Sequence, residues 1–262
     1  TNKLEPTAGG TMIDSSLSRG ITTYPDLLIQ SGRIAGGFTG GAGVHSQYGF
    51  GRGFDSYLDD RRFGGMDHSM GPAMEWVREN RSSPFFLFLH GYDSHGQYDL
   101  PASQRQGITG FDTDLNGSIE EQAELRERGL QTIENPGDAI DLTGVLDEQD
   151  AGYLEKVYDL KVQNADQRLG NFIDFLRTEG LYDNSIIVLF SDHGDEFMEH
   201  QGLDHGSTLY QEQLHVVMMV HFPGYDDRMD VEAPVRTMDI FPTIFDALEL
   251  AGPKDVDGSS LL

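Results

Sequence analysis

The sequence predicts an α/β fold with a mostly parallel central sheet flanked by helices. Short continuous apolar runs bounded by turn residues are typical of strands that are buried on both faces of such a sheet. Four runs have this form, at residues 34–38, 85–89, 186–190 and 216–220. Apolar residues at helical spacing over residues 150–178 predict one long amphipathic helix, which Gly180 ends. We expect a single domain over residues 1–262.

The first elements in chain order are a loop, a helix and a strand. Residues 1–20 are polar, small and without periodicity, so we expect a loop or arm there. Residues 22–31 have an apolar side and predict a helix. Gly32 leads into the strand at residues 34–38, and a glycine-rich loop follows over residues 40–51.

A second helix and the most apolar strand come next. Apolar residues between Met70 and Val77 recur at helical spacing, and we expect this stripe to belong to the core. Pro84 then opens the strand at residues 85–89, which runs directly into His90. A histidine at a strand end is most often a hydrogen-bonded structural residue, and we expect this role for His90.

Residues 99–150 are predicted to form an acidic insertion that lies over or beside the sheet and has no core of its own. Acidic residues outnumber basic ones there, and hydrophobic periodicity is weak. Residues 112–119 read DTDLNGSI, which has the opening of a calcium-binding loop. The twelfth position of that loop is Ala123, where a bidentate Glu is required. A solvated acidic loop is therefore favoured over a calcium site.

Asp192 and His193 directly follow the strand predicted at residues 186–190, with only Ser191 between. Ligands of open α/β sheets bind beyond the carboxyl ends of the strands. An Asp beside a His at that place offers a hard oxygen and an imidazole nitrogen to a divalent metal. The residues alone leave two interpretations open, a metal site or a polar turn that caps the strand.

Four linked motifs in this stretch resemble those of the sulfatase family of the alkaline-phosphatase superfamily. That family carries S-D-[HN]-G after a strand, then G-E-H-G, then H-G-x-T-x-Y-E-E, and a closing strand followed by P-G. The counterparts here are SDHG at 191–194, EHQG at 199–202, HGSTLYQE at 205–212 and PG at 223–224. With weaker similarity elsewhere, the resemblance extends from about residue 22 to residue 262.

The resemblance implies a metal-dependent sulfuric ester hydrolase, that is, a sulfatase. It implies that Asp192 and His193 ligate a divalent cation. Ca²⁺ is the first expectation. Mn²⁺ and Zn²⁺ are alternatives, because many sulfatases have Asn where His193 stands, and an imidazole nitrogen suits these ions while Ca²⁺ prefers oxygen ligands. It also implies that His95 and His205 are catalytic and donate hydrogen bonds to the sulfuryl oxygens or protonate the leaving alcohol. His95 matches the family's P-H-x-P-Y histidine, although both prolines of that motif are replaced here.

The family's nucleophile motif has no clear counterpart. That motif is C/S-x-P-x-R, whose first residue becomes formylglycine, and residues 15–19 resemble it with Leu17 in place of Pro. We therefore expect a domain that is incomplete at both ends. The nucleophile that attacks the substrate is expected to be a formylglycine upstream of this chain, with Ser15 as the minor alternative. Two other functions stay open, a phosphodiesterase or phosphonate monoester hydrolase of the same superfamily and a catalytically inactive metal-binding fragment.

Composition limits the partners of the protein. The 44 acidic and 18 basic residues give a formal net charge of −26, which disfavours nucleic acid and anionic membranes as partners. No apolar run approaches the roughly 20 residues that span a membrane. Nothing at the start looks like a signal peptide, although a start without Met is compatible with a removed leader. We expect a small sulfated or phosphorylated substrate. The oligomeric state and the location are left open. A periplasmic or extracellular location is implied only by the resemblance.

Overall fold

The computed structural model describes residues 4–6, 15–18, 20–95, 100–134, 139–206, 208–225, 227–253 and 256–262. The chain forms two compact units. Unit 1 comprises Thr1–Tyr92, Arg168–Val188 and Val220–Leu262, and unit 2 comprises Asp93–Gln167 and Leu189–Met219. The expectation of a single domain stays a prediction.

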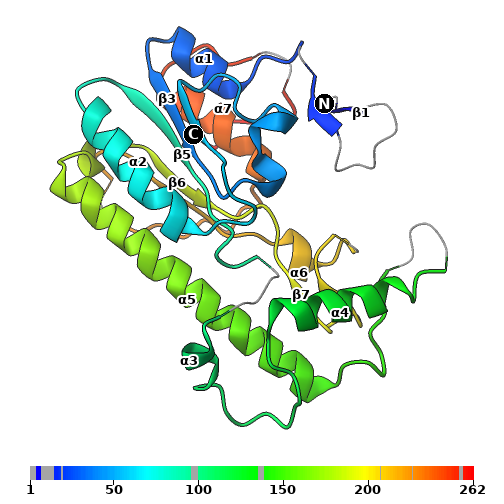
Figure 1. The fold of residues 1–262 in the computed structure, drawn as a ribbon. Helices are drawn as coiled ribbons and strands as arrows, with labels where there is room; N and C mark the ends of the chain where they lie inside the picture. Colours follow the sequence, from blue (N-terminus) through cyan, green and yellow to red (C-terminus); the bar gives the residue numbers. More distant parts are fainter. Residues whose placement is uncertain are drawn as a thin grey trace. The chain divides into compact units, whose positions relative to one another are not determined.

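Unit 1 is built on a three-stranded parallel sheet, which confirms the predicted α/β architecture (Figure 1). The strand order is β4–β3–β5, with β3 (Ile34–Phe38) in the middle. β5 (Phe85–Leu89) runs alongside the whole of β3, whereas β4 (Ser56–Leu58) pairs with its second half. β4 was not predicted, because three residues are too few to show a periodicity.

One face of this sheet is covered by α2 (Met66–Asn80) and by the last turns of α5 (Glu148–Thr178). Together they enclose a hydrophobic core, whose buried members are Phe38, Ala73, Trp76, Val77, Phe172, Phe175 and Leu176. Trp76 meets Phe85 of β5 edge to face, with ring centroids 5.7 Å apart. The predicted helix with the methionine stripe is thus confirmed as a core helix.

The opposite face of the sheet is covered by α1 (Tyr24–Gln30) and α7 (Ile240–Ala247). The ring of Phe241 stacks on Tyr24 at 4.0 Å between centroids and lies 6.2 Å from Phe86 of β5. Because successive side chains of a strand point to opposite faces, Phe85 and Phe86 of one strand serve the two layers. Unit 1 is therefore a helix–sheet–helix sandwich.

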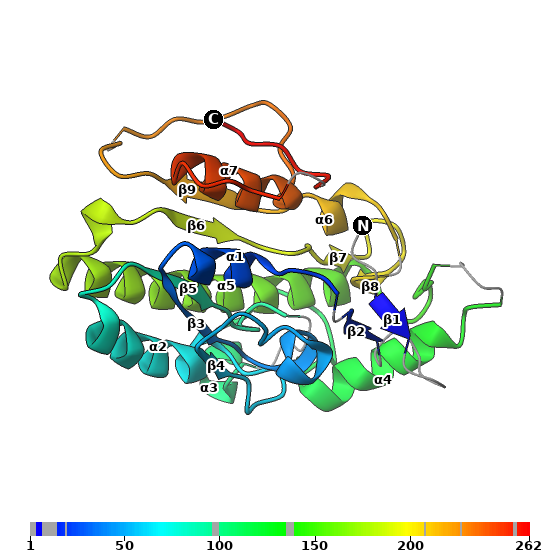
Figure 2. The ribbon, with the colours of Figure 1, turned by 90° about the horizontal axis from the view of Figure 1, so that it is seen from above.

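A second, two-stranded sheet is formed by β6 (Ile187–Phe190) and β9 (Met218–His221) (Figure 2). Both predicted strands exist, but the expectation that they are buried on both faces is wrong. Phe190 in β6, and Met219 and Val220 in β9, are exposed. In the described part of the chain each of these two strands pairs only with the other.

Unit 2 has a hydrophobic core of its own, which corrects the prediction that residues 99–150 lack one. The buried residues of this core are Leu100, Leu125, Leu142, Leu146, Tyr153, Leu154, Val157 and Leu203. The acidic segment supplies the first four of them, partly through α4 (Ile119–Leu130), and the first half of α5 supplies the next three. Widely spaced leucines give no periodic signal along the chain, and this is why the core was missed.

Residues 112–118 lead into α4 as a helix cap. The Ser118 hydroxyl accepts a hydrogen bond from the backbone N–H of Glu121 at 3.3 Å. The Glu121 carboxylate in turn accepts from the backbone N–H groups of Asn116 and Gly117 at 2.7–3.0 Å. The loop's acidic groups do not gather into a metal-binding group in the described residues. The geometry is that of a capped helix start, and it adds nothing in favour of the calcium alternative.

The remaining elements are short. β1 (Leu4–Pro6) pairs antiparallel with β2 (Ser15–Leu17), so part of the loop predicted at residues 1–20 is a strand pair, and residues 1–3, 7–14 and 19 lie outside the described residues. Unit 2 also contains α3 (Ala102–Arg105) and α6 (Gln211–Leu214). No helix in the described ranges has both the length and the apolar character to cross a membrane.

Candidate functional site

A short hairpin that follows β6 carries most of the candidate site. In it, β7 (Glu196–Phe197) pairs antiparallel with β8 (Leu203–Asp204). Met198, Gln201 and Asp204 have φ angles of 70°, 73° and 74°, in the left-handed region that side chains disfavour. Such strain is stored at functional sites and persists only where the surroundings hold the backbone in place.

The side chain of Glu196 holds this hairpin from inside. It is fully buried, and its carboxylate accepts hydrogen bonds from the backbone N–H groups of His200 at 2.8 Å and Gly202 at 3.0 Å. The Gln213 amide in α6 donates to it at 3.3 Å, and the Thr208 hydroxyl at 3.4 Å. A buried carboxylate is tolerated only when its oxygens are hydrogen-bonded. Glu196 therefore ties the hairpin to the helix that follows it.

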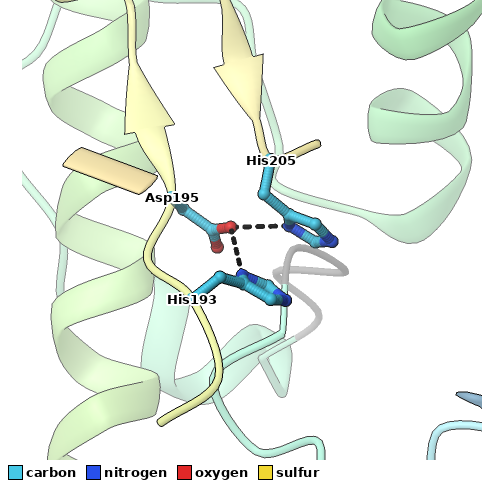
Figure 3. A group of neighbouring side chains, drawn as sticks. All are labelled: His193, Asp195 and His205. Atoms are coloured by element: carbon cyan, nitrogen blue, oxygen red, sulfur yellow. Dashed lines mark hydrogen bonds and ion pairs between the residues drawn. The ribbon is translucent and has the colours of Figure 1, made fainter. Parts of the chain in front are cut away.

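His205 lies just after β8, with its ring between two carboxylates. Its Nδ1 is 2.7 Å from Oδ1 of Asp195 and 2.6 Å from Oδ1 of Asp204. Figure 3 shows His205 and Asp195 facing each other from the two sides of the hairpin. Burial by itself would lower the pKa of His205, but the hydrogen bond that Nδ1 donates to Asp195 and the adjacent carboxylate of Asp204 outweigh it and raise the pKa to about 9. The ring is thus an imidazolium at neutral pH.

His95 lies beside His205, with ring centroids 5.0 Å apart. Burial lowers the pKa of His95, and the positive charge of His205 lowers it further, so the pKa values of the two rings shift in opposite directions. Lys161 of α5 is buried and donates a hydrogen bond to the backbone carbonyl of His95 at 3.1 Å. The structure brings the two predicted catalytic histidines together; residues 96–99, which complete the motif predicted around His95, lie outside the described residues.

Asp192 and His193 follow β6 and differ in exposure. The Asp192 side chain is 79% exposed, and its Oδ1 lies 3.7 Å from Nε2 of His193. The other ring nitrogen of His193, Nδ1, lies 3.0 Å from the backbone carbonyl of Gly194, to which it donates. Metal-ligating histidines characteristically donate in this way through the nitrogen that does not bind the metal. Oδ1 of Asp192 and Nε2 of His193 are therefore placed to share one ion.

A second set of potential ligands shares His193 with this pair. His193, Asp195 and His205 each offer an atom, and these atoms lie within 4.8 Å of one another (Figure 3). The rings of His193 and His205 are 3.8 Å apart at their centroids. An ion bound here would displace the 2.7 Å hydrogen bond between His205 and Asp195, whereas an ion at Asp192 and His193 would leave it in place. The assignment of Asp192 and His193 as ligands stays a prediction.

Three acidic residues of the site were not singled out in the sequence. Asp195 and Glu196 directly follow the SDHG motif, and Asp204 directly precedes His205. Their position beside motif residues is the one signal that marks them. Their roles depend on the folding of the hairpin, which brings Asp195 to His205 across ten residues.

Two further residues from the sequence predictions lie elsewhere. His90 belongs to unit 1, where its ring meets Tyr92 edge to face at 4.6 Å and its backbone carbonyl accepts a hydrogen bond from the Ser69 hydroxyl. This environment agrees with a structural role. The side chain of Ser15 and the whole of Arg19, which form the ends of the weak nucleophile motif, lie outside the described residues.

Comparison with known proteins decides the family. The model of the sulfatase family matches residues 36–250. The chain belongs to the sulfatase family. Arylsulfatase K of Gallus gallus is 31% identical to this sulfatase chain over 202 residues, and that of Bos taurus is 27% identical over 202 residues. Both alignments cover 72% of the chain and 37% of the relative, so the chain spans little more than a third of the length of these relatives.

Solved structures of low sequence identity share the fold. The phosphonate monoester hydrolase of Agrobacterium radiobacter has a TM-score of 0.70 and 17% identity, with 94% of this chain and 62% of that chain covered. A protein solved in complex with its substrate D-glucosamine-2-N,6-O-disulfate has a TM-score of 0.61 and 17% identity, covering 94% of this chain and 64% of that chain. These likenesses confirm the predicted alkaline-phosphatase/sulfatase-like fold.

Proposed function

We propose that this sulfatase-family chain supplies the metal-binding and anion-binding part of a sulfuric ester hydrolase. The observation that carries the proposal is the grouping of four residues within unit 2. An exposed Asp–His pair, Asp192 and His193, stands next to His205, which two carboxylates hold, and His95 lies beside His205. A scaffold without a ligand has no need of such a grouping, whereas a site that binds an ester with charged oxygens requires it.

The donor set of Asp192 and His193 fits a divalent cation. A carboxylate oxygen suits Ca²⁺, the first expectation, while an imidazole nitrogen equally suits Mn²⁺ or Zn²⁺. Once bound, such a cation would supply Lewis-acid polarisation of the ester oxygens. His193 keeps Nε2 available for it, because Nδ1 donates its hydrogen to the Gly194 carbonyl.

His205 and His95 would bind and orient the sulfuryl group. Because Nδ1 of His205 is engaged by Asp195 and Asp204, the ring orientation is fixed and Nε2–H is left to donate to a substrate oxygen. His95, whose ring centroid lies 5.0 Å from that of His205, offers a second imidazole for a hydrogen bond to the same group or to the leaving alcohol. These residues bind and orient the ester; the group that attacks sulfur is not among them.

The function is tested by the hydrolysis of three substrates, an aryl sulfate, an aryl phosphate diester and an aryl phosphonate. This chain and the protein in its natural full length are compared, each with and without a chelator. We expect chelator-sensitive turnover with the sulfate preferred. Preference for the phosphonate or the diester would favour the second candidate, a phosphonate or phosphodiester hydrolase. The imidazole of His193 supports this candidate because it suits Mn²⁺ or Zn²⁺. Lack of turnover on all three substrates would leave the catalytically inactive metal-binding fragment.

The metal assignment predicts different effects of two carboxylate substitutions. Asp192→Ala removes a ligand and is expected to lower metal affinity by at least about 100-fold, whereas Asp195→Asn removes a partner of a neighbouring histidine and is expected to cost about 10-fold. Isothermal titration with Ca²⁺ and Mn²⁺ measures both affinities, and thermal melting verifies that each variant is folded. The reverse ranking would place the ion among His193, Asp195 and His205 instead.

A further inference from the structure

The two carboxylate oxygens of Asp204 have different partners. Oδ1 lies 2.6 Å from Nδ1 of His205. Oδ2 accepts a hydrogen bond from Nη1 of Arg126 at 3.3 Å. Asp204 thus connects His205 to an arginine of α4, a helix that belongs to the acidic segment of residues 99–150. No residue of that segment was predicted to belong to the site.

The backbone that carries Arg126 is fixed on its other side. The neighbouring Leu125 is buried in the core of unit 2, and α4 starts at the cap formed by Ser118 and Glu121. The acidic segment also contacts the hairpin a second time, since the backbone N–H of Leu142 donates to the carbonyl of Gln201 at 2.7 Å. Arg126 therefore projects from a helix that is packed into the core of unit 2, in a segment that contacts the hairpin at two points.

Asp204 requires such a partner for two reasons. Its φ of 74° is disfavoured for a residue with a side chain, so contacts around Asp204 must hold this conformation, and the ion pair with Arg126 is one of them. Its carboxylate also shares Nδ1 of His205 with the carboxylate of Asp195, and two like charges at one nitrogen repel each other. A guanidinium on the far oxygen of Asp204 opposes that repulsion.

We propose that Arg126 is a positioning residue of the sulfate-ester site, which acts through Asp204 to keep the His205 ring directed at the substrate. The proposal rests on the function proposed above. It assigns α4 a role in the active site through Arg126, an exposed arginine that would otherwise have no function there. Because the Arg126 side chain is 58% exposed, its ion pair contributes little to overall stability. The effect of its removal should therefore appear in catalysis and not in unfolding.

The test compares Arg126→Ala, Arg126→Lys and the control Arg128→Ala in the natural full-length protein. Arg128 is an exposed arginine of the same helix, so its removal changes the charge equally. For aryl sulfate hydrolysis we expect Arg126→Ala to lower kcat by about 10- to 100-fold with little change in KM, Arg126→Lys to restore most of it, and Arg128→Ala to have no effect. Melting temperatures should be equal in all four proteins. Equal losses in Arg126→Ala and Arg128→Ala, or a loss that follows the melting temperature, would overturn the proposal.

A second readout separates this proposal from the proposed function. The Nδ1–H proton of His205, which is hydrogen-bonded to Asp195, gives an imidazole NMR signal that is protected from exchange with water as long as Asp195 and the adjacent carboxylate of Asp204 keep their places. We expect Arg126→Ala to speed the exchange of this proton, and Arg128→Ala to leave it unchanged. If the wild-type protein hydrolyses no sulfate ester, the proposed function fails while this measurement still decides whether Arg126 positions His205. Unchanged exchange in Arg126→Ala would refute that role.

Discussion

Replacing His205 with alanine is expected to lower kcat/KM for a sulfate ester by about 10²- to 10⁴-fold, the range for removal of a positioned proton-donating group. The imidazole is held by Asp195 and Asp204 through Nδ1, so its substitution removes a donor that is already oriented before the substrate arrives. Metal affinity should fall far less, because Asp192 and His193 remain. Steady-state kinetics on an aryl sulfate measures the loss.

His200→Ala is the matched control for His205→Ala. His200 belongs to the same hairpin, but its ring stacks on Tyr210 at 3.4 Å between centroids. Its backbone N–H, which donates to Glu196, is retained in the alanine variant. We expect the control to change kcat/KM by less than about 5-fold, since its ring touches no group of the proposed site. Similar losses in both variants would show that the hairpin responds to any change and that His205 has no special role.

The largest effect on stability is expected from Glu196→Ala. The substitution removes the acceptor of four donors, those of His200, Gly202, Thr208 and Gln213, of which the donors of Gly202 and Gln213 are buried. Hydrogen bonds to a charged group contribute about 1.5–3 kcal/mol each, so the free energy of unfolding should fall by about 3 kcal/mol or more. Since the strained hairpin relaxes without this carboxylate, metal affinity should fall as well.

Urea denaturation measures the Glu196 effect, with two comparison variants. Glu196→Gln keeps one carbonyl acceptor and should lose about half as much stability. Glu199→Ala removes an exposed carboxylate of the same hairpin, which accepts one backbone hydrogen bond from Phe197, and should cost about 1 kcal/mol or less. A Glu196→Ala protein as stable as the Glu199→Ala protein would contradict the view that Glu196 holds the hairpin together.

The sequence predicts those parts of the fold that have a local pattern. The strand at residues 85–89 and the helix at residues 150–178 are found where hydrophobic periodicity placed them, as β5 and α5. The position of Asp192, His193 and His205 in one part of the structure follows from motifs that are linked along the chain. His95, about a hundred residues earlier, was assigned by resemblance alone, and the structure brings its ring to His205.

Features that depend on distant contacts were not predictable from the sequence. The core of unit 2 joins leucines from four separate places in the acidic segment to α5. Asp195 and Asp204 become partners of His205 only when the hairpin closes, and Arg126 reaches Asp204 from 78 residues away. No local propensity or spacing encodes such pairs, because the chain between them sets the contact through tertiary packing.

The charge of the protein adds a condition to the proposed chemistry. A formal net charge of −26 repels a sulfated substrate at long range. The site must therefore provide local positive charge, which His205 and a bound divalent cation would supply together. This coupling links the two halves of the proposed site, since neither the metal pair nor the histidines would hold the ester alone.

Diffraction from crystals of the protein grown with Mn²⁺ and inorganic sulfate tests this arrangement most directly. We expect an anomalous manganese peak in contact with Oδ1 of Asp192 and Nε2 of His193, and a sulfate within hydrogen-bonding distance of Nε2 of His205. A manganese peak enclosed by His193, Asp195 and His205, with Asp192 still turned to solvent, would contradict it.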